Sequence, residues 1–240
     1  MSTEPVTVSV VSHGQNRLVN ALLRDLAGLG SSGLRIVVTQ NVPDAEPLAA
    51  AANVEVVVND WPKGFGANHN AAFRRCSTKL FSVVNPDIRL HADPFPGLIA
   101  VLQSGRVGVI GPLARNPEGR AEDSARRFPT FGSLLLKLLP GSPGPDYPLD
   151  QGPREVDWIA GMFMLFRSDA YRAAGGFDER FFLYYEDVDI CRRLRLLGYG
   201  CVFHPEVSVT HDARRASRKN LRLMGTHAAS AARYLARRYR

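Results

Sequence analysis

Three short stretches of the sequence place carboxylate or imidazole groups where they could do chemistry. Asn85-Pro86-Asp87 follows the apolar stretch FSVV, Glu186-Asp187-Val188-Asp189 follows the aromatic run FFLYY, and His211 follows VSVT. A carboxylate held by a proline-stiffened turn at the end of a strand can meet a divalent cation or a diphosphate. Asn, Pro and Asp are also common turn residues, so this tripeptide alone is more typical of a plain turn.

The acidic cluster opens a predicted helix over 186–197, directly after the aromatic residues 181–185. Acids at a helix start interact favourably with the helix dipole, and Asp189 can pair with the arginine four residues later, so part of the cluster has a structural explanation. An aromatic wall also lowers the local dielectric, which raises the pKa of a carboxyl group toward the range of a general base. We therefore take Glu186 and Asp187 as candidate catalytic residues.

The elements that must position these groups alternate along the first half of the chain. Apolar, β-branched stretches predict strands at 6–11, 36–39, 54–58 and 81–84, and leucine or alanine spacing predicts helices at 16–29 and 66–76. This alternation indicates an α/β fold with a mostly parallel central sheet flanked by helices. Ligands of such sheets bind beyond the carboxyl ends of the strands. Those ends are Ser12–His13, Thr39–Asn41, Asn59–Asp60 and Asn85–Asp87.

A glycine-rich segment, Gly64-Phe65-Gly66-Ala67-Asn68, opens the second of these helices. Glycine permits close approach of the backbone to a phosphate or a sugar, so we expect Gly64 and Asn68 near a donor. The spacing matches neither a dinucleotide fingerprint nor a P-loop. In the second half, 201–203 and 207–210 predict two short strands, and 140–153 predicts a proline-rich loop.

The charge of the chain is unevenly distributed. Its 240 residues carry a formal +7, but 214–240 holds nine Lys or Arg and no Asp or Glu, which leaves 21 basic and 23 acidic residues in 1–213. The body is therefore mildly acidic, which disfavours a nucleic-acid-binding role. We divide the chain into one domain over 1–212, with halves at about 6–110 and 111–212, and a basic tail over 213–240.

The tail has the pattern of a basic amphipathic helix. On a helical projection of 218–240, Leu and Ala residues occupy one sector and Lys and Arg residues another. Such a helix can lie on an anionic membrane surface, or it can pack its alanine-rich stripe against the body or a second subunit in a homodimer. The sequence leaves both alternatives open.

Cysteine usage and hydropathy indicate the compartment. Three cysteines without CxxC spacing argue against a disulfide framework and a Cys-ligated zinc site. No signal-peptide pattern or membrane-spanning apolar run is present in the sequence. We expect a cytoplasmic protein whose membrane contact, if any, is peripheral, on the inner face of the cell membrane.

The segment 158–211, with its GGFDERFF and EDVD blocks, closely resembles the second half of family 2 glycosyltransferases, especially rhamnosyltransferase-like members. GFGANHNAAF and the NPD turn match the first half in the same order, so the resemblance covers about 6–211. It implies an A-type glycosyltransferase fold, with a nucleotide-sugar-binding first half and an acceptor-binding second half. It also implies an inverting enzyme that moves a sugar from a nucleotide diphosphate to a hydroxyl group.

The resemblance assigns donor roles to the ends of the first two strands. It implies that Val11, Ser12 and His13 flank the nucleoside base. Many relatives have an acid after the second strand, where this chain has Gln40 and Asn41. These two amides can hydrogen-bond a base or ribose, but the missing carboxylate leaves the nucleotide open.

The resemblance also implies how the diphosphate is held. Asp87 takes the last place of a DxD-type motif and contacts the diphosphate through Mg²⁺ or Mn²⁺, while Asn85 stands in the first place. His211 matches a further metal or phosphate ligand. Gly161 leaves space for the sugar.

On the acceptor side, the resemblance makes Asp187 the general base and Glu186 its neighbour in the acidic pair. Trp158 lines the acceptor side, next to the aromatic pair Tyr184 and Tyr185. The donor it favours is dTDP-rhamnose, with a cell-envelope glycan or glycolipid as acceptor. UDP-galactofuranose, UDP-glucose and UDP-N-acetylglucosamine remain as alternative donors, and a non-catalytic basic adaptor as an alternative of another class.

Overall fold

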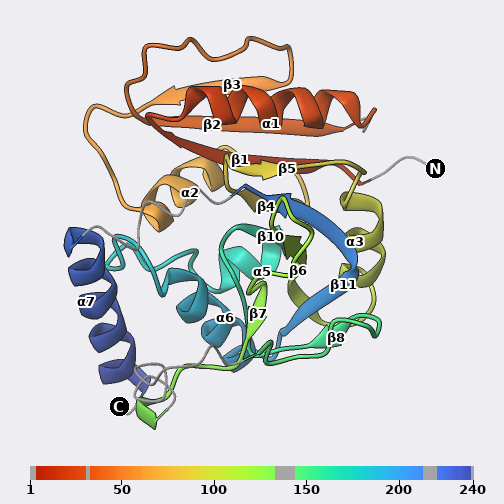
Figure 1. Cartoon of the computed structure of the whole chain (residues 1–240), viewed down its shortest axis with the longest axis vertical. Helices are drawn as coiled ribbons and strands as arrows, with labels where there is room; N and C mark the ends of the chain where they lie inside the picture. The colour runs from red at the N-terminus through yellow and green to blue at the C-terminus, as the bar shows by residue number, and fades with distance from the viewer. Residues whose placement is uncertain (1–3, 31–32, 133–143, 213–220, 239–240) are drawn as a thin grey trace.

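The computed structural model describes residues 4–30, 33–132, 144–212 and 221–238. A mixed sheet of nine strands within these ranges forms the centre, in the order β3-β2-β1-β4-β10-β6-β11-β5, with β8 beside β11 (Figure 1). The strands of this sheet are β1 (Val6–His13), β2 (Leu34–Val42), β3 (Val54–Val58), β4 (Leu80–Val84), β5 (Ile88–Arg89), β6 (Val107–Arg115), β8 (Arg154–Glu155), β10 (Phe163–Arg167) and β11 (Gly200–His211). A short pair, β7 (Ala125–Arg126) and β9 (Trp158–Ile159), lies outside it.

The first half forms the parallel part of the sheet, as the strand–helix alternation predicts. β1 runs parallel to both β2 and β4, and β2 runs parallel to β3. Their carboxyl ends therefore meet along one edge. The second half continues the same sheet, because β10 pairs antiparallel with β4 and with β6. The two halves thus share one sheet, and the site can draw on both.

One expectation for the second half is wrong. The segments predicted as two short strands belong to a single strand, β11, which pairs with β6 through most of its length. Its register shifts between His204 and Ser208, around Pro205. Proline has no N–H group to donate to the ladder, so this irregularity accounts for the break in the sequence pattern.

Helices cover both faces of the sheet. They are α1 (Asn16–Gly28), α2 (Phe65–Phe73), α3 (Phe95–Leu102), α5 (Ser168–Ala173), α6 (Glu186–Leu196) and α7 (Leu221–Arg238). Apolar residues of α1 and α3 pack in one buried cluster, and those of α2, α5 and α6 in another on the opposite face. Burial on both faces explains why the central strands are apolar almost throughout.

The described part of the tail is the helix α7, which packs against the body next to α6 and the preceding loop (Figure 1). Tyr234 and Leu235 are buried there. Arg233 donates to the backbone oxygen of Arg180, and Arg237 pairs with Asp178, so both basic side chains face the body. The predicted tail residues 213–220, 239 and 240 lie outside the described residues.

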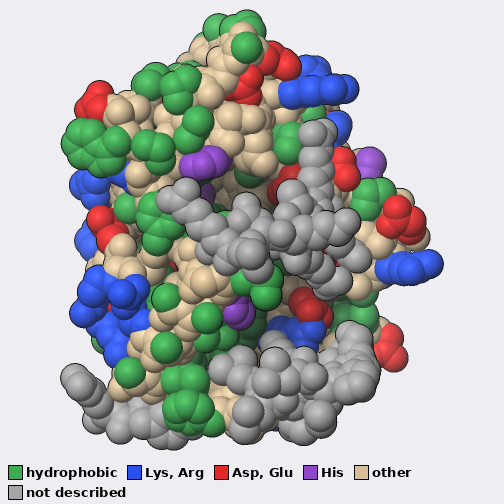
Figure 2. Space-filling view, turned by 60° about the vertical axis from the view of Figure 1, so that its left-hand side comes forward, with side chains coloured by type: hydrophobic (Ala, Val, Ile, Leu, Met, Phe, Trp, Pro, Cys, Tyr) green, Lys and Arg blue, Asp and Glu red, His purple; other side chains and the backbone are tan. Residues whose placement is uncertain are grey.

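The face around α7 shows Lys and Arg side chains in several separate groups among acidic and hydrophobic ones (Figure 2). Among the described helices, none is long and apolar enough to cross a bilayer. All three cysteines are free.

Candidate active site

The carboxyl ends of β1, β2 and β3 are joined by a network of asparagine side chains. Asn59 donates to the side-chain oxygens of Asn41 at 2.8 Å and Asn68 at 2.7 Å. Asn41 in turn exchanges hydrogen bonds with the backbone of Lys63 and lies 3.0 Å from the Nδ1 atom of His13. The network fixes this edge of the sheet as one rigid surface, because every amide in it has a backbone or side-chain partner.

The structure brings the predicted donor residues of β1 and β2 together. Ser12 pairs with Gln40 and His13 with Val42 across the two strands, with a register shift between these pairs. Val11 and Gln40 are partly exposed, and His13 is exposed. Ser12 is fully buried and donates to Asn16, so its side chain supports the loop after β1.

The glycines at the start of α2 have a structural explanation within the protein. A Cβ atom on Gly64 would come within 2.7 Å of the backbone oxygen of Phe182, and one on Gly66 within 2.6 Å of the Cβ atom of Phe177. The N–H group of Phe65 donates to the same Phe182 oxygen at 2.8 Å. These glycines let the segment before α6 lie directly against α2, and their contribution to donor binding stays a prediction.

Asp87 and His211 meet at the edge of the sheet, where β5 pairs with β11. The Nε2 atom of His211 lies 3.4 Å from Asp87 Oδ2, and its Nδ1 atom lies 2.5 Å from Oε2 of Glu122. The other oxygen of Asp87, Oδ1, is buried and has no hydrogen-bond partner. A cavity of about 470 Å³, lined by residues that include Glu122 and His211, opens beside this group.

The two carboxylates control the protonation of His211. Burial alone lowers the pKa of this imidazole, but the bonds and charges of Asp87 and Glu122 outweigh burial and raise its pKa to about 9. The ring is therefore charged at neutral pH without a metal. Two acids that charge a histidine form an environment that also suits a cation.

Asp87 and His211 fit a divalent cation. They offer a carboxylate and an imidazole, and the unpartnered Oδ1 atom of Asp87 is the kind of buried acceptor that a cation satisfies. Within the described residues, no group of three or more His, Cys, Asp or Glu side chains is arranged to hold a metal. The protein would thus supply few ligands, and donor phosphates and water the rest, as is common for Mg²⁺.

The turn at Gly161 and Met162 connects this region to the acidic pair of α6. The N–H group of Gly161 donates to Asp187 Oδ2 at 2.9 Å. The N–H group of Asn85 donates to the oxygen of Met162, also at 2.9 Å. Because these turn residues are consecutive, the Asp187 carboxylate and the Asn85-Pro86-Asp87 turn flank one short segment.

Among the described residues, no Lys, Arg or His side chain forms an ion pair with Asp187 or Glu186. Burial raises the pKa of Asp187, although the N–H groups of Gly161 and Val188 partly oppose this effect. Burial and the neighbouring Asp187 charge raise the pKa of Glu186 well above its usual range. Glu186 is 5% exposed and its Oε2 atom has no hydrogen-bond partner, whereas Asp187 is partly exposed. Asp187 is therefore the acid that a substrate can reach.

Two consecutive tyrosines direct the chain into α6. Tyr184 and Tyr185 have φ angles of 71° and 69°, in the left-handed region. Such a conformation costs about 1–3 kcal/mol for a residue other than glycine and persists only where surrounding contacts impose it. The turn places Asp187 in the first turn of α6, where the helix dipole favours its anionic form.

The aromatic residues predicted on the acceptor side also come together. Trp158 and Tyr184 pack against the buried cluster that contains Phe181 and Tyr185. The indole N–H group of Trp158 donates to the backbone oxygen of Arg127 at 3.0 Å. These aromatic residues thus gather in the segment next to the acidic pair.

Sequence reasoning missed Glu122 and Lys63. Glu122 belongs to an irregular segment whose sequence shows no periodicity, so only its contact with His211 singles it out. Asn59 was identified as a strand end, but its bonds to two other asparagines depend on the packing of α2. The pairing of Asp189 with Arg193, expected from helical spacing, is confirmed at 2.7 Å.

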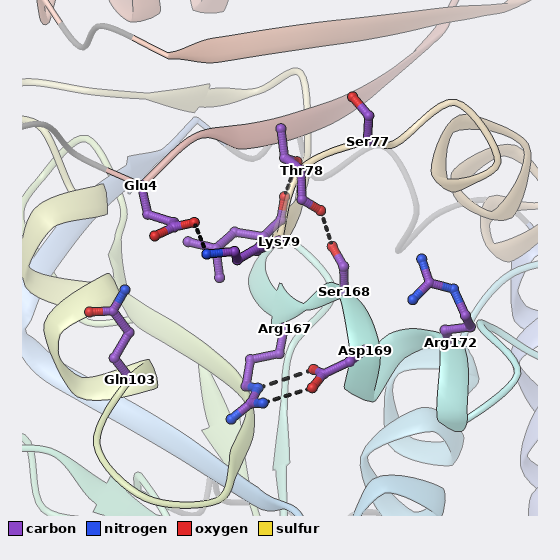
Figure 3. Close-up of a pocket in the computed structure, with 10 residues that line it drawn as sticks. Glu4, Ser77, Thr78, Lys79, Gln103, Arg167, Ser168, Asp169 and Arg172 are labelled. Atoms are coloured by element: carbon purple, nitrogen blue, oxygen red, sulfur yellow. Dashed lines mark hydrogen bonds and ion pairs between the residues drawn. The ribbon is translucent and has the colours of Figure 1, made fainter.

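A second cavity, of about 400 Å³, lies where β4 begins and β10 ends (Figure 3). Arg167 and Asp169 pair there at 2.7 Å, and Lys79 lies 3.3 Å from Glu4. Its charged groups thus largely satisfy one another. It contains none of the predicted site residues.

Comparisons with known proteins identify the family of the chain. Residues 4–228 match the family model described as "Glycosyltransferase like family 2". The chain is 31% identical over 216 residues to the N-acetylglucosaminyl-diphospho-decaprenol L-rhamnosyltransferase of Mycobacterium tuberculosis, an alignment that covers 84% of this chain and 69% of that protein. It is 28% identical over 251 residues to rhamnosyltransferase WbbL of Escherichia coli, covering 97% and 93%.

A solved structure shares the fold. The mannosyltransferase PcManGT of Pyrobaculum calidifontis, in complex with GDP-Man and Mn²⁺, superposes with a TM-score of 0.63 at 16% identity. The match covers 96% of this chain and 65% of that one. At this identity the likeness shows the fold alone.

Proposed function

Because the chain belongs to glycosyltransferase family 2, we propose that it transfers a sugar from a nucleotide diphosphate to an acceptor hydroxyl, with Asp187 as the base. The observation that carries this proposal is the placement of Asp187. Asp187 is partly exposed, its carboxylate accepts a hydrogen bond from the Gly161 N–H group, and it closely follows the aromatic segment 181–185. Those features give a base that is both accessible and poised to accept a proton.

In the proposed reaction, one bond forms and one bond breaks at the anomeric carbon of the donor sugar. Asp187 takes the proton of the acceptor hydroxyl while the acceptor oxygen forms a bond to the anomeric carbon. The bond from that carbon to the diphosphate oxygen breaks, and the nucleoside diphosphate leaves with the electron pair. In-line attack inverts the anomeric carbon. Glu186 is buried behind Asp187, and we propose that it stays protonated so that only one charge occupies the pair.

We propose that Asp87 and His211 hold Mg²⁺ or Mn²⁺. When bound, the cation stabilises the charge that develops on the departing diphosphate. Glu122 orients the His211 ring from the opposite side, which is the usual arrangement behind a histidine that binds a metal. The protein groups therefore define a diphosphate end of the site at Asp87 and a proton-accepting end at Asp187.

The relatives' names support L-rhamnose as the sugar, and the name of one supports a lipid-linked acceptor. We propose dTDP-rhamnose as the donor and a cell-envelope glycan or glycolipid as the acceptor. UDP-sugars are the alternative donors, since Gln40 and Asn41 replace the acid found in many relatives. A thermal-shift panel of dTDP-, UDP- and GDP-sugars, each with and without Mn²⁺, tests this choice. We expect the largest stabilisation from dTDP-rhamnose with the metal. A shift from another nucleotide alone would reassign the donor, and no shift from any nucleotide would overturn the proposal.

A lipid-linked acceptor would bring the protein to a membrane surface. One rhamnosyltransferase relative is named for an acceptor on decaprenol, which supports this possibility. Arg233 and Arg237 both contact the body, so these two side chains are not free to bind a membrane. We therefore propose that the protein associates with the membrane surface through its lipid-linked acceptor. Sedimentation with vesicles that contain the lipid-linked acceptor, compared with acceptor-free anionic vesicles, distinguishes binding through the acceptor from binding through basic charge.

A further inference from the structure

The C-terminal helix α7 contacts the segment that leads into the catalytic helix. Ser230 donates from its hydroxyl to the backbone oxygen of Leu183 at 2.9 Å. The rings of Tyr234 and Tyr185 lie 5.6 Å apart, and Tyr234 is 1% exposed. His227, one turn before Ser230, lies 5.1 Å from the Tyr184 ring and 5.3 Å from the Tyr185 ring. The helix therefore touches three consecutive residues, 183–185.

Those residues carry the least favourable backbone of the site. Tyr184 and Tyr185 are the only non-glycine residues with positive φ in the described ranges. Contacts from outside must hold such a turn, because local energetics oppose it. On the side of α2, the Phe65 N–H group donates to the backbone oxygen of Phe182, the residue before Leu183. The turn is thus held between α2 and α7.

Charged contacts anchor α7 beside this turn. Arg237 pairs with Asp178 and lies 3.6 Å from Asp189, on the helix that begins with the acidic pair. Arg233 donates to the oxygen of Arg180, and its guanidinium lies over the Phe181 ring at 5.9 Å. These contacts lie on both sides of 183–185 in the sequence. They therefore fix the position of α7 relative to the turn that it touches.

From these contacts we infer that α7 is a positioning element for the catalytic base, and that Ser230 and Tyr234 are its positioning residues. They hold the left-handed turn at Tyr184 and Tyr185, and the turn aims Asp187 at the N–H group of Gly161. This inference rests on the proposed role of Asp187. It assigns to the basic tail a task in the transfer step itself.

A positioning role and a merely structural role predict different kinetics. If the turn relaxes, Asp187 loses its orientation while the donor end at Asp87 and His211 stays intact. Transfer then slows without a matching loss of donor binding. Asp187 also loses the N–H bond that lowers its pKa, so the acid limb of the kcat profile moves to higher pH.

The test uses three variants of the full chain. Tyr234→Leu removes the ring but keeps apolar volume, Tyr234→Phe keeps the ring, and Ala232→Ser alters an exposed position of the same helix. We expect kcat to fall about tenfold for Tyr234→Leu with donor KM within about twofold, because misorientation mainly affects the chemical step. Tyr234→Phe should restore most of kcat, and Ala232→Ser should match the wild type. Ser230→Ala is a smaller change for use if Tyr234→Leu does not fold.

Amide hydrogen exchange at Gly161 gives a readout that needs no activity. We expect faster exchange at Gly161 in Tyr234→Leu or Ser230→Ala than in Ala232→Ser, since the bond to Asp187 weakens. Wild-type kcat and unchanged Gly161 exchange, with only a lower melting temperature, would overturn the inference. A parallel Asp187→Asn variant separates the two proposals: if it turns over like the wild type, the proposed base is wrong, whatever Tyr234→Leu does.

Discussion

Two pairs of carboxyl side chains in this protein lie in opposite surroundings. At the edge of β5 and β11, Asp87 and Glu122 enclose His211 and raise its pKa to about 9. At the start of α6, Glu186 is buried and Asp187 is partly exposed, and burial raises the pKa of both acids. The first pair of carboxylates favours the charged form of the histidine between them, whereas burial disfavours the charged form of the second pair itself.

This difference separates the two halves of the proposed reaction. Carboxylates that pair with a histidine suit a cation and a diphosphate, whereas a carboxylate whose pKa is raised by burial suits proton acceptance. The Gly161–Met162 turn keeps the two ends adjacent. Removing an acid from either end should therefore give distinct defects.

The largest effect should come from Asp187→Asn. An amide cannot accept the acceptor proton, so we expect kcat to fall by about a thousandfold, within the range for loss of a general base. Steady-state transfer to the acceptor measures it. Asp169→Asn is a matched control, since Asp169 pairs with Arg167 at the far cavity (Figure 3). Wild-type turnover by Asp187→Asn would show that Asp187 is not the group that accepts the proton.

The next effect should come from Asp87→Asn, at the charged end. We expect the Mn²⁺ concentration that gives half-maximal activity to rise by about 10–100-fold, because a carboxylate ligand is lost. Mn²⁺ titration of the transfer rate, checked by the paramagnetic resonance signal of free Mn²⁺, measures this change. An unchanged metal requirement would remove Asp87 from the metal site.

A smaller effect concerns His211 in the metal-free protein. Its folded pKa lies near 9, above the ordinary 6.5, so the stability it contributes is complete below pH 6.5 and is lost as the pH rises through about 9. Glu122→Gln should lower the melting temperature at pH 6.5 by a few degrees and flatten its decline toward pH 9, since about 1 kcal/mol shifts a domain of this size by about 2–4 °C. Identical pH profiles for the two proteins would show that Glu122 does not charge His211.

The smallest effect should appear at Glu186, in a different pH window. Its folded pKa is raised, so stability is highest below the ordinary value of 4.5 and declines as the pH rises through the folded pKa. Glu186→Gln removes the ionisation and should reduce this decline in a metal-free melting series. If the stability of Glu186→Gln declined with pH as steeply as that of the wild type, ionisation of Glu186 would not be the cause of the decline.

Much of the scaffold could be predicted from the sequence. The strands that lead to Ser12 and Asn85 are rich in apolar residues and largely buried, because both faces of the sheet are covered there. The resemblance to family 2 glycosyltransferases, with its A-type fold, is confirmed by the family match and the shared fold. Asp87 and His211, which are 124 positions apart in the chain, were paired by resemblance and lie 3.4 Å apart.

Other features depend on contacts that no local pattern encodes. The glycines at Gly64 and Gly66 suggested a phosphate site, but they admit the segment 177–182. Glu122 reaches His211 from a segment 89 residues away. The tail pattern left a membrane and the body as alternatives, and only the packing of Tyr234 shows that the described helix lies on the body.

The central claim, that the two acidic groups do separate work, is tested most directly by measuring donor affinity and transfer rate together in Asp187→Asn and Asp87→Asn. With Mn²⁺ present, we predict that Asp187→Asn binds the donor like the wild type but transfers about a thousandfold more slowly. Asp87→Asn should bind the donor more weakly and recover part of its rate at high Mn²⁺. If both variants lose donor affinity and rate in the same proportion, the separation of the two groups is contradicted.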